Sequence, residues 1–450
     1  MTVLISILSF ILVLLPLIIF HEFGHYFSAK FFKIKVLEFG FGFPPKLFSV
    51  WSGNNSLKIS QKLKEKYLHA KSNKNLFITT DLANDNPVLG DIFVTKSEAT
   101  KGSNEEFIEI SSHFLKEDEI HFKEMQWSFN ILPLGGFVRP FGEENSNHPE
   151  SFYVKKSYQR LIVLVSGVLV NFILPFFLFF LANLIPGDTP KSDLIILDVV
   201  KDSPAYIAGL KVGDKILLIN DRSIYDMSSL QKSITASLGE KIIIKIERGT
   251  PNLFSEAWEE KFFYDGDFKS VSVIPRWNPP EGEGAMGISI LIDNTIRVKS
   301  DSSISESFDK SIFNVFQLFD LSINSIKAMV FGSSNPQFSG PTAVGPVGIS
   351  QITGTIAVAE INLRDKLMIY VELISILSLS LAVINLLPIP ALDGGRILFV
   401  LIEILRNGKK VSAEKERLVH GLGFIFMIAL LFIITAQDII RLYQGISVVG

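Results

Sequence analysis

The sequence predicts a polytopic α-helical membrane protein with about four transmembrane helices, β-hairpins close to the membrane and an extracytoplasmic α+β domain. Hydrophobic residues make up 48% of the 450 residues, and the mean hydropathy is +0.34, which is high for a water-soluble protein. Charged residues still make up 20%, too many for a chain built only of membrane spans. The composition therefore indicates spans combined with water-facing domains.

Four stretches approach the ~20 apolar residues that a helix needs to cross a bilayer core of about 30 Å. They are residues 3–20, 161–185, 367–391 and 418–437. The first lacks the basic start and the small-residue cleavage site of a signal peptide, so we expect it to remain as a span.

Basic residues in short loops predict the orientation, because cytoplasmic loops carry an excess of Lys and Arg. Residues 396–417 include six of them, and further lysines and arginines lie in residues 30–35 and 155–160. Both loops are therefore expected in the cytoplasm. With an even number of spans, both termini and residues 186–365 are expected outside.

The first predicted cytoplasmic segment has two parts. Residues 36–45 and 127–140 alternate apolar and small residues with Gly and Pro at their ends, which is typical of strands or hairpins. Residues 51–124 are rich in Lys, Asn, Glu and Ser, a composition that predicts a solvated, charged insertion.

The predicted external segment begins with strands at 194–200, 215–220 and 241–247 and short helices at 203–210 and 228–236. This order, and residues 203–220 in particular, resembles a PDZ domain. PDZ domains bind peptides by adding a strand to a sheet edge, so the domain is expected to bind C-terminal ends of substrates. Residues 286–288 are a candidate loop for the terminal carboxylate, although Gly287 is equally suited to an ordinary turn.

Residues 307–331 have apolar side chains at helical spacing and few charges. This pattern predicts an amphipathic helix on the membrane, or alternatively a core helix of the external domain.

Composition also limits the chemistry. The chain has no cysteine, which excludes disulfides, cysteine nucleophiles, iron–sulfur clusters and zinc fingers. A formal net charge of −3 shows no basic excess that would favour nucleic acid. Any metal must therefore be held by His, Asp or Glu.

His21, Glu22 and His25 fit the pattern H-E-x-x-H at the end of the first apolar stretch. On a helix, two histidines four residues apart project from one face and can share a metal ion, with the glutamate beside them to handle water. Ionisable residues in such a place are costly in hydrocarbon and usually mark a function. The competing interpretation is interfacial histidines that hydrogen-bond to lipid or backbone.

A catalytic zinc ion normally has three protein ligands, so two histidines leave the site one short. Asp393 offers a carboxylate within the third apolar stretch, where two prolines interrupt the helix and two glycines follow. Unwound backbone at this depth is tolerated when it is buried in protein or lines a wet cavity. Asp393 as a plain helix cap is the structural alternative.

Together the motifs resemble the site-2 protease family of intramembrane zinc metalloproteases, and within it the bacterial RseP-type enzymes. They are HEFGH at 21–25, VLEFGFGFPP at 36–45, ILPLGGFVRP at 131–140, the PDZ signature at 203–220 and NLLPIPALDGGR at 385–396. They occur in the family's order and cover most of the chain.

The resemblance implies a role for each matching residue. His21, His25 and Asp393 would bind Zn²⁺, and Glu22 would be the general base. Asn385 would hold the substrate backbone, and a membrane-associated hairpin would pair with the substrate as a strand through Gly135, Gly136 and Phe137. The resemblance also suggests a place near the site for Asn171, in a span that lacks the family's usual proline, and it leaves residues 345–349 (GPVGI) without a clear role.

The implied function is hydrolysis of peptide bonds within transmembrane segments of single-span proteins, such as anti-sigma factors or remnant signal peptides, in the bacterial inner membrane. The expected partners are these substrates and the lipid bilayer. A catalytically silent PDZ-containing membrane adaptor is the main alternative, but it does not explain the metal-binding pattern. A conventional zincin acting on soluble peptides is weakened because its motif helix would lie in lipid.

The expected domain organisation follows the chain. It comprises transmembrane helix 1 (1–30), a cytoplasmic loop with hairpins and the insertion (31–158), transmembrane helix 2 (159–185), the PDZ domain (186–276), a linker with the amphipathic helix (277–366), transmembrane helix 3 (367–395), a cytoplasmic loop (396–417) and transmembrane helix 4 (418–440).

Overall fold

The computed structural model describes residues 2–81, 88–102, 107–143, 148–185, 187–252, 262–280, 282–300, 303–331 and 343–444. The chain forms two compact units. The first unit comprises residues 7–171 and 384–430, and the second comprises residues 1–6, 172–383 and 431–450. Each unit is described by itself.

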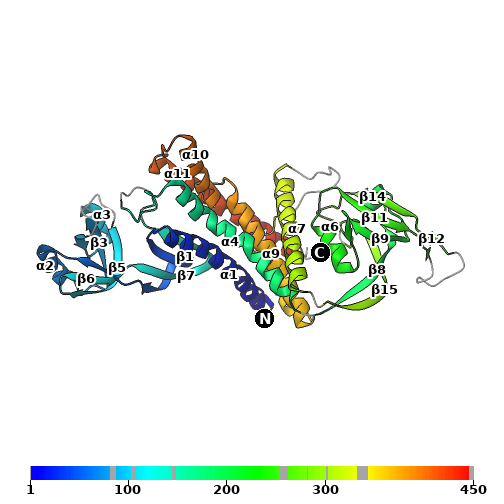
Figure 1. Cartoon of the computed structure of the whole chain (residues 1–450), viewed down its shortest axis with the longest axis horizontal. Helices are drawn as coiled ribbons and strands as arrows, with labels where there is room; N and C mark the ends of the chain where they lie inside the picture. The colour runs from blue at the N-terminus through cyan, green and yellow to red at the C-terminus, as the bar shows by residue number, and fades with distance from the viewer. Residues whose placement is uncertain are drawn as a thin grey trace. The chain divides into compact units, whose positions relative to one another are not determined.

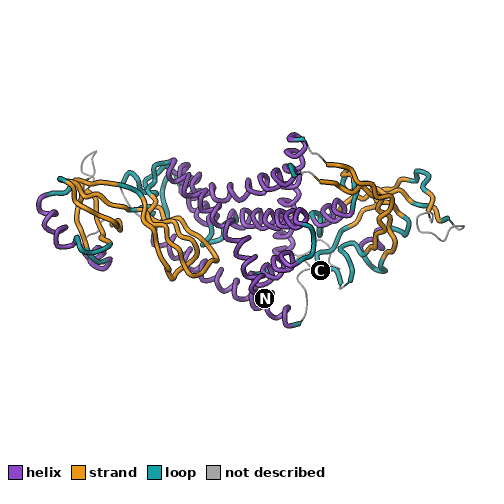
Figure 2. The backbone as a smooth tube through the Cα atoms, turned by 90° about the horizontal axis from the view of Figure 1, so that it is seen from below, coloured by secondary structure: helices purple, strands orange, loops and turns teal. Residues whose placement is uncertain are grey.

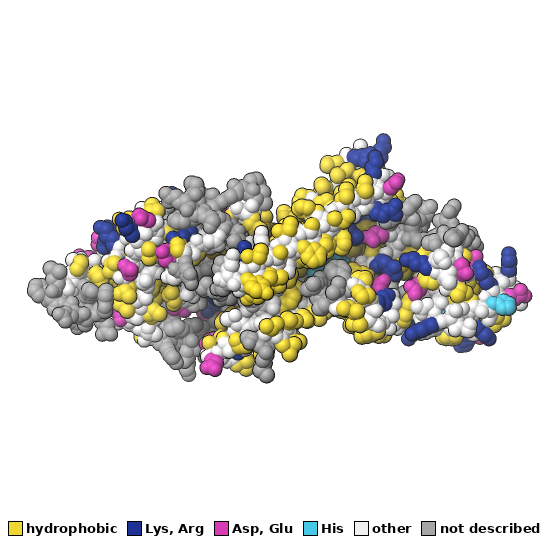
Figure 3. Space-filling view, turned by 180° about the vertical axis from the view of Figure 1, so that it is seen from behind, with side chains coloured by type: hydrophobic (Ala, Val, Ile, Leu, Met, Phe, Trp, Pro, Cys, Tyr) yellow, Lys and Arg dark blue, Asp and Glu magenta, His cyan; other side chains and the backbone are white. Residues whose placement is uncertain are grey.

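Four described helices are long and apolar enough to cross a membrane, as the sequence predicts. They are α1 (Thr2–Phe31), α4 (Ser157–Asn183), α9 (Leu363–Leu386) and α11 (Ala413–Tyr443) (Figure 1). Their outward faces carry exposed apolar side chains, seen as yellow surface in Figure 3, and on α11 these include Leu422, Phe426 and Phe432. Such surface is suited to contact with lipid rather than with water.

In the first unit, α1 and α4 pack with α10 (Asp393–Leu405) around one apolar cluster. Tyr26 and Ala29 from α1 meet Val163 from α4 and Ile397 from α10. A buried ion pair adds to this contact, because Arg160 on α4 reaches both carboxylate oxygens of Glu403 on α10, at 2.5 and 2.6 Å.

The prediction for the third apolar stretch is confirmed in one respect and wrong in another. Helix α9 ends at Leu386, and the chain leaves helical structure until α10 begins at Asp393, as two prolines in the intervening sequence suggest. However, residues 396–405 are helical rather than part of a loop. Apolar residues at helical spacing in this segment, such as Ile397 and Val400, pack into the core of the first unit and favour the helix.

The strands predicted at 36–45 and 127–140 are confirmed, and both are longer. They are β1 (Val36–Ser52) and β7 (Met125–Pro140) (Figure 2). Residues 36–41 pair with 136–140 on one side and with 126–129 on the other, while residues 46–52 pair with 125–130. Two bent strands thus interlock, and within the described pairing the arm 136–140 lies at an edge.

Residues 51–124 are not merely a solvated insertion, because the described part folds into a closed five-stranded barrel with two short helices. Its elements are β2 (Asn55–Lys58), α2 (Gln61–Ala70), β3 (Asn75–Asp81), β4 (Val88–Phe93), α3 (Lys96–Gly102), β5 (Phe107–Lys116) and β6 (Glu119–Lys123). Alternate residues such as Leu76 and Ile78, or Ile108 and Ile110, point into a shared apolar core. A polar average composition hid this period-two pattern.

The second unit contains a six-stranded sheet of order β14-β11-β9-β8-β15, with β10 beside β9. Its strands and helices are β8 (Gly187–Val199), α5 (Pro204–Ala208), β9 (Asp214–Ile219), β10 (Arg222–Ser223), α6 (Met227–Thr235), β11 (Ile242–Arg248), β14 (Phe268–Val273) and β15 (Ile288–Ser300). A separate pair, β12 (Thr250–Pro251) and β13 (Phe262–Phe263), completes the strands. The five elements predicted between 194 and 247 are all present.

The predicted amphipathic helix at 307–331 corresponds to α7 (Ile304–Phe331). One face packs Val315 and Leu318 against Phe179 of α4 and Val371 of α9, while Phe316 is exposed. The helix therefore has one face in a protein core and one face open.

Residues 345–349, in the second unit, form the start of a helix that contacts α11. Gly345 and Pro346 begin α8 (Pro346–Val358), and the Gly348 N–H donates to Asp438 Oδ2 of α11 at 2.8 Å. The glycines allow this close approach, since a Cβ would lie 2.8 Å from Asp438 Oδ2 at Gly345 and 3.3 Å from it at Gly348. The carboxylate is buried and ties the start of α8 to the last turns of α11.

Candidate metal centre

His21 and His25 lie one helical turn apart on α1, and their rings meet edge to face with centroids 4.8 Å apart. The two Nε2 atoms are 3.2 Å from each other, so both point at one place. His21 is buried, and the side chain of His25 is only 12% exposed. The helical spacing predicted from the sequence therefore delivers two convergent nitrogen atoms.

Asp393, the first residue of α10, supplies the third atom. Its Oδ2 lies 3.1 Å from His21 Nε2 and 3.2 Å from His25 Nε2. Among the described residues, His21, His25 and Asp393 are the group of metal-ligand side chains whose atoms converge in this way.

The triangle of ligand atoms fits a zinc ion. Atoms bound at about 2.0–2.2 Å to a tetrahedral ion stand roughly 3.3 Å or slightly more from each other, and the three edges measure 3.1, 3.2 and 3.2 Å. Two imidazoles and one carboxylate form the donor set of catalytic zinc sites, which keep a fourth position open.

Each histidine has a partner for its second ring nitrogen. His25 Nδ1 lies 2.8 Å from the carbonyl oxygen of Val163, so Nδ1 carries the hydrogen and Nε2 is left free to bind a metal. The side-chain amide of Asn171 lies 3.2 Å from His21 Nδ1, and Asn171 is fully buried. The sequence suggested a place near the site for Asn171, and the structure puts it against His21.

Two glycines provide the space in which these rings lie. A Cβ at Gly24 on α1 would lie 2.5 Å from the carbonyl oxygen of Ser166, so this glycine allows α1 and α4 to approach backbone to backbone. A Cβ at Gly167 on α4 would lie 2.4 Å from His25 Nε2. The role of Gly167 was not predicted, because nothing local marks it as facing another helix.

Glu22 lies on the same helix turn as the two histidines and next to the β-sheet. A Cβ at Gly136 of β7 would come within 2.9 Å of Glu22 Cγ and 3.0 Å of Ile18 Cγ2. The glycine thus lets the edge arm of β7 lie directly against the catalytic candidate.

The remaining predicted residues also lie in the first unit. The Asn385 side-chain amide is buried, with Nδ2 3.4 Å from His21 Nε2. Gly135 is buried in β7. The ring of Phe137 lies over Gly40, because a Cβ added at Gly40 would stand 2.2 Å from Phe137 Cε1. Gly136 and Phe137 pair with Phe41 and Gly40 in β1.

Two histidines with converging nitrogen atoms, a carboxylate from a second helix and an adjacent glutamate, all on or beside long apolar helices, define a membrane-embedded metalloprotease of the HExxH class. The chain belongs to peptidase family M50, the site-2 proteases, whose family model matches residues 9–60 and 112–430. The chain is therefore a zinc metalloendopeptidase of the site-2 protease type. The described part of the unmatched residues 61–111 belongs to the barrel and its two helices.

Relatives agree with this assignment. The zinc metalloprotease RasP of Geobacillus kaustophilus is 27% identical over 462 residues, covering 97% of this chain and 98% of that protein. The regulator of sigma-W protease RasP of Bacillus subtilis is 26% identical over 459 residues, covering 97% and 99%. A protein of Clostridium acetobutylicum is 29% identical over 320 residues, covering 71% of this chain and 84% of its own length.

Proposed function

We propose that this protein hydrolyses peptide bonds within the transmembrane segments of single-span proteins, with zinc held by His21, His25 and Asp393 and with Glu22 as general base. The observation that carries the proposal is the triangle of candidate ligand atoms, whose edges of 3.1–3.2 Å suit tetrahedral zinc, on a long apolar helix.

Zinc bound there would lower the pKa of a water molecule to about 7 and polarise the scissile carbonyl. Glu22 takes a proton from the attacking water and delivers it to the leaving amine, which is the work of a general base that becomes a general acid. Asn385 lies beside His21 and can donate its amide hydrogens to a substrate carbonyl. Val163 and Asn171 keep the histidine rings in position.

A transmembrane helix hides its carbonyls in internal hydrogen bonds, so the substrate must unwind before it is cut. The edge arm 136–140 of β7 supports the proposal that the unwound stretch is stabilised as an added strand. Gly136 lies against Glu22, so a strand paired along this arm would pass close to the general base. Gly135, Gly136 and Phe137 are accordingly proposed as substrate-binding residues.

Anti-sigma factors and remnant signal peptides are the proposed substrates. The Bacillus subtilis relative is described as a regulator of a sigma factor, which supports the first of these classes for a protein of similar length. The proposed location is the bacterial inner membrane, with both termini outside, and the domain boundaries expected from the sequence are retained as part of this proposal. The basic residues flanking α1, α4 and α11 support this orientation.

We also propose that the α+β domain formed by the six-stranded sheet is a PDZ domain that receives C-terminal ends of substrates. Strand β15 pairs with β8 along one side only within the described residues, so its other edge can accept a peptide strand. Gly287 favours the turn interpretation of residues 286–288, because its φ is +71° and its N–H already donates to Gly284.

The test uses the purified full chain, the Glu22→Gln variant and a model single-span substrate. An amide cannot accept the proton, so Glu22→Gln should bind zinc as the native protein does and lose cleavage by about 10²-fold or more. Comparison of membranes that contain either form should reveal single-span proteins that accumulate with the variant and thereby identify substrates. Cleavage by Glu22→Gln near the native rate would show that the proposed mechanism is wrong.

A further inference from the structure

A hydrogen bond joins α11 to the unwound segment that precedes Asp393. The Ala391 N–H donates to His420 Nδ1 at 3.0 Å. We infer that His420 is a positioning residue for the metal site: it holds the segment 387–392, and through it the Asp393 carboxylate, in the geometry that binds zinc. This inference rests on the proposed ligand set and adds a residue to it.

The N–H groups of Ile389 and Leu392 donate to carbonyl oxygens within the segment, whereas the N–H of Ala391 is bonded to another helix, through His420. Pro388 and Pro390 have no N–H to donate. Ala391 has a φ of +79°, a left-handed conformation that is unfavourable for a residue with a side chain. Leu392 occupies the N-cap position of α10 and provides no side-chain cap.

The glycines that follow Asp393 show how tightly the segment folds onto α10. A Cβ at Gly394 would lie 2.0 Å from the Leu387 carbonyl oxygen, and a Cβ at Gly395 would lie 2.6 Å from that of Ile389. The start of α10 is therefore in backbone contact with the segment, so a displacement at Ala391 reaches Asp393 two residues later.

Helix α11 is in close contact with the same segment at a second point. A Cβ at Gly423 would lie 2.4 Å from Pro390 Cβ and 2.6 Å from its carbonyl oxygen. Gly423 is three residues after His420, so both project from one face of α11. The ring of His420 also lies 5.5 Å from that of Phe399 on α10. These contacts fix the His420 ring opposite Ala391.

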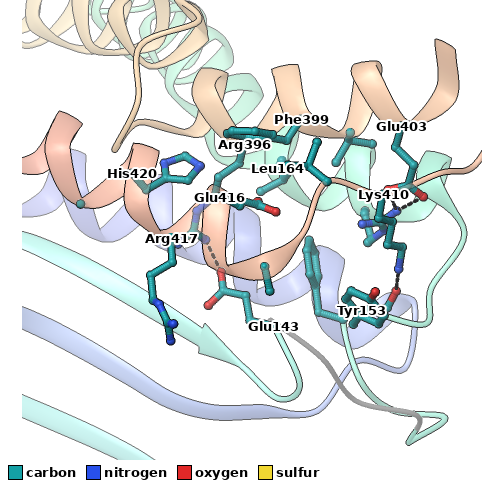
Figure 4. Close-up of a pocket in the computed structure, with 16 residues that line it drawn as sticks. Glu143, Tyr153, Leu164, Arg396, Phe399, Glu403, Lys410, Glu416, Arg417 and His420 are labelled. Atoms are coloured by element: carbon teal, nitrogen blue, oxygen red, sulfur yellow. Dashed lines mark hydrogen bonds and ion pairs between the residues drawn. The ribbon is translucent and has the colours of Figure 1, made fainter. Parts of the chain in front are cut away.

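His420 acts at a distance from the metal ligands. It borders a cavity of about 320 Å³ with Arg396, Glu416 and Phe399, and Figure 4 shows its ring beside Arg396. It does not belong to the convergent group of His21, His25 and Asp393. The inferred route from His420 to Asp393 is the backbone of the segment 387–392, which His420 holds at the Ala391 N–H.

The experiment measures zinc affinity of the purified full chain by competition with a chelator, and the absorption spectrum after cobalt(II) replaces zinc. His420→Phe keeps the ring and its contact with Phe399 but removes the acceptor. It should weaken zinc binding by about 10- to 100-fold, the usual effect of losing a partner that orients a metal ligand, and should alter the cobalt spectrum. His420→Asn should restore both, because its Oδ1 takes the place of Nδ1.

A second comparison keeps the inference testable if His420→Phe does not fold. His420→Gln is polar and similar in size, but its acceptor stands one carbon further from the backbone, so it should bind zinc more weakly than His420→Asn. Native affinity in His420→Phe, or equal affinity in His420→Asn and His420→Gln, would overturn the inference.

His25→Ala and Asp393→Ala in the same assay separate this inference from the proposed function. If these two variants bind zinc as the native protein does, the proposed ligand set is wrong. If they lose zinc while all His420 variants keep native affinity, the ligand set stands and only the positioning role of His420 is rejected.

Discussion

Gly167 on α4 lies so close to His25 on α1 that a Cβ atom at this position would stand 2.4 Å from His25 Nε2. It would also stand 2.9 Å from His21 Cε1. The geometry of the site therefore depends on a residue without a side chain as well as on the three proposed ligands, because a Cβ at position 167 leaves no room for both rings.

The first prediction is that Gly167→Ala displaces the histidines and lowers zinc affinity by about 10-fold or more, the scale of a disturbed ligand environment. Gly421→Ala on α11 is the matched control, since a Cβ there meets nothing within 4 Å. Zinc content after graded chelation measures the effect in both. Equal zinc retention by the two variants would mean that the helices relax around the added methyl group.

The second prediction concerns the contact between Asp438 and Gly348. Asp438→Ala leaves the Gly348 N–H without its acceptor in a buried place, which should lower the free energy of unfolding by about 1–3 kcal/mol. Asp438→Asn keeps an oxygen that can accept this hydrogen bond, so its free energy of unfolding should fall less than that of Asp438→Ala. Thermal unfolding of detergent-purified protein provides the comparison. An unfolding temperature of Asp438→Ala equal to that of the native chain would contradict the contact.

The third prediction tests the proposed orientation in the membrane. Single cysteines replacing Asn407, in the turn before α11, and Asp221, in the α+β domain, should be labelled from opposite sides of the membrane. Asn407→Cys should react only from the cytoplasmic side and Asp221→Cys only from outside. Both positions are exposed, and the native chain has no cysteine, so no other residue reacts with the thiol reagent. Labelling of both from the same side would reject the orientation.

The parts of this protein that could be predicted from the sequence are those with strong local signals. Apolar stretches of span length, the four-residue spacing of His21 and His25, and the prolines before Asp393 each act within one segment. The joint order of these motifs identified the family and led to the proposal of Asp393 as the third ligand. None of these predictions requires knowledge of which helices are in contact.

The missed features depend on contacts between distant segments. Gly348 and Asp438 are separated by 90 residues in the sequence. Ala391 and His420 are separated in the sequence by helix α10. The barrel within residues 51–124 was missed for a different reason: its inward residues alternate with Lys, Glu and Asn, so the average composition appears solvated although one face of each strand is apolar. Alternation over a few residues is a weaker signal than a long apolar run.

The last prediction is that the α+β domain selects substrates by excluding bulky ones and takes no part in the chemistry. In the second unit, Lys232 of α6 forms an ion pair with Glu372 of α9 at 3.5 Å, and the Arg222 guanidinium lies 4.2 Å from the centre of the Phe313 ring on α7. The domain is thus docked on helices near the proposed outer side. A substrate with a large external part would collide with it, whereas a shortened substrate would pass.

The sheet register shows where the domain can be removed. Asp193 of β8 pairs with Asp293 of β15, so excision of residues 194–292 leaves two ends that a short Gly-Ser linker can join. A deletion that stopped at residue 274 would leave β15 without its partner strand, since β15 begins at Ile288. The excised form should cleave short, pre-trimmed substrates at near the native rate and should also cleave full-length ones.

A point variant tests the same idea with the domain in place. Lys232→Glu puts a negative charge opposite Glu372 and should loosen the docking, so that full-length substrates are cleaved faster than by the native chain. Lys269→Glu makes the same charge change at an ion pair within the domain, with Asp267, and should leave selectivity unchanged. The ratio of cleavage rates for full-length and shortened substrates is the measurement. Exclusion by this domain would be rejected if the excised form and Lys232→Glu both discriminate against full-length substrates as strictly as the native chain does. It would also be rejected if the zinc-loaded excised form loses activity on short substrates.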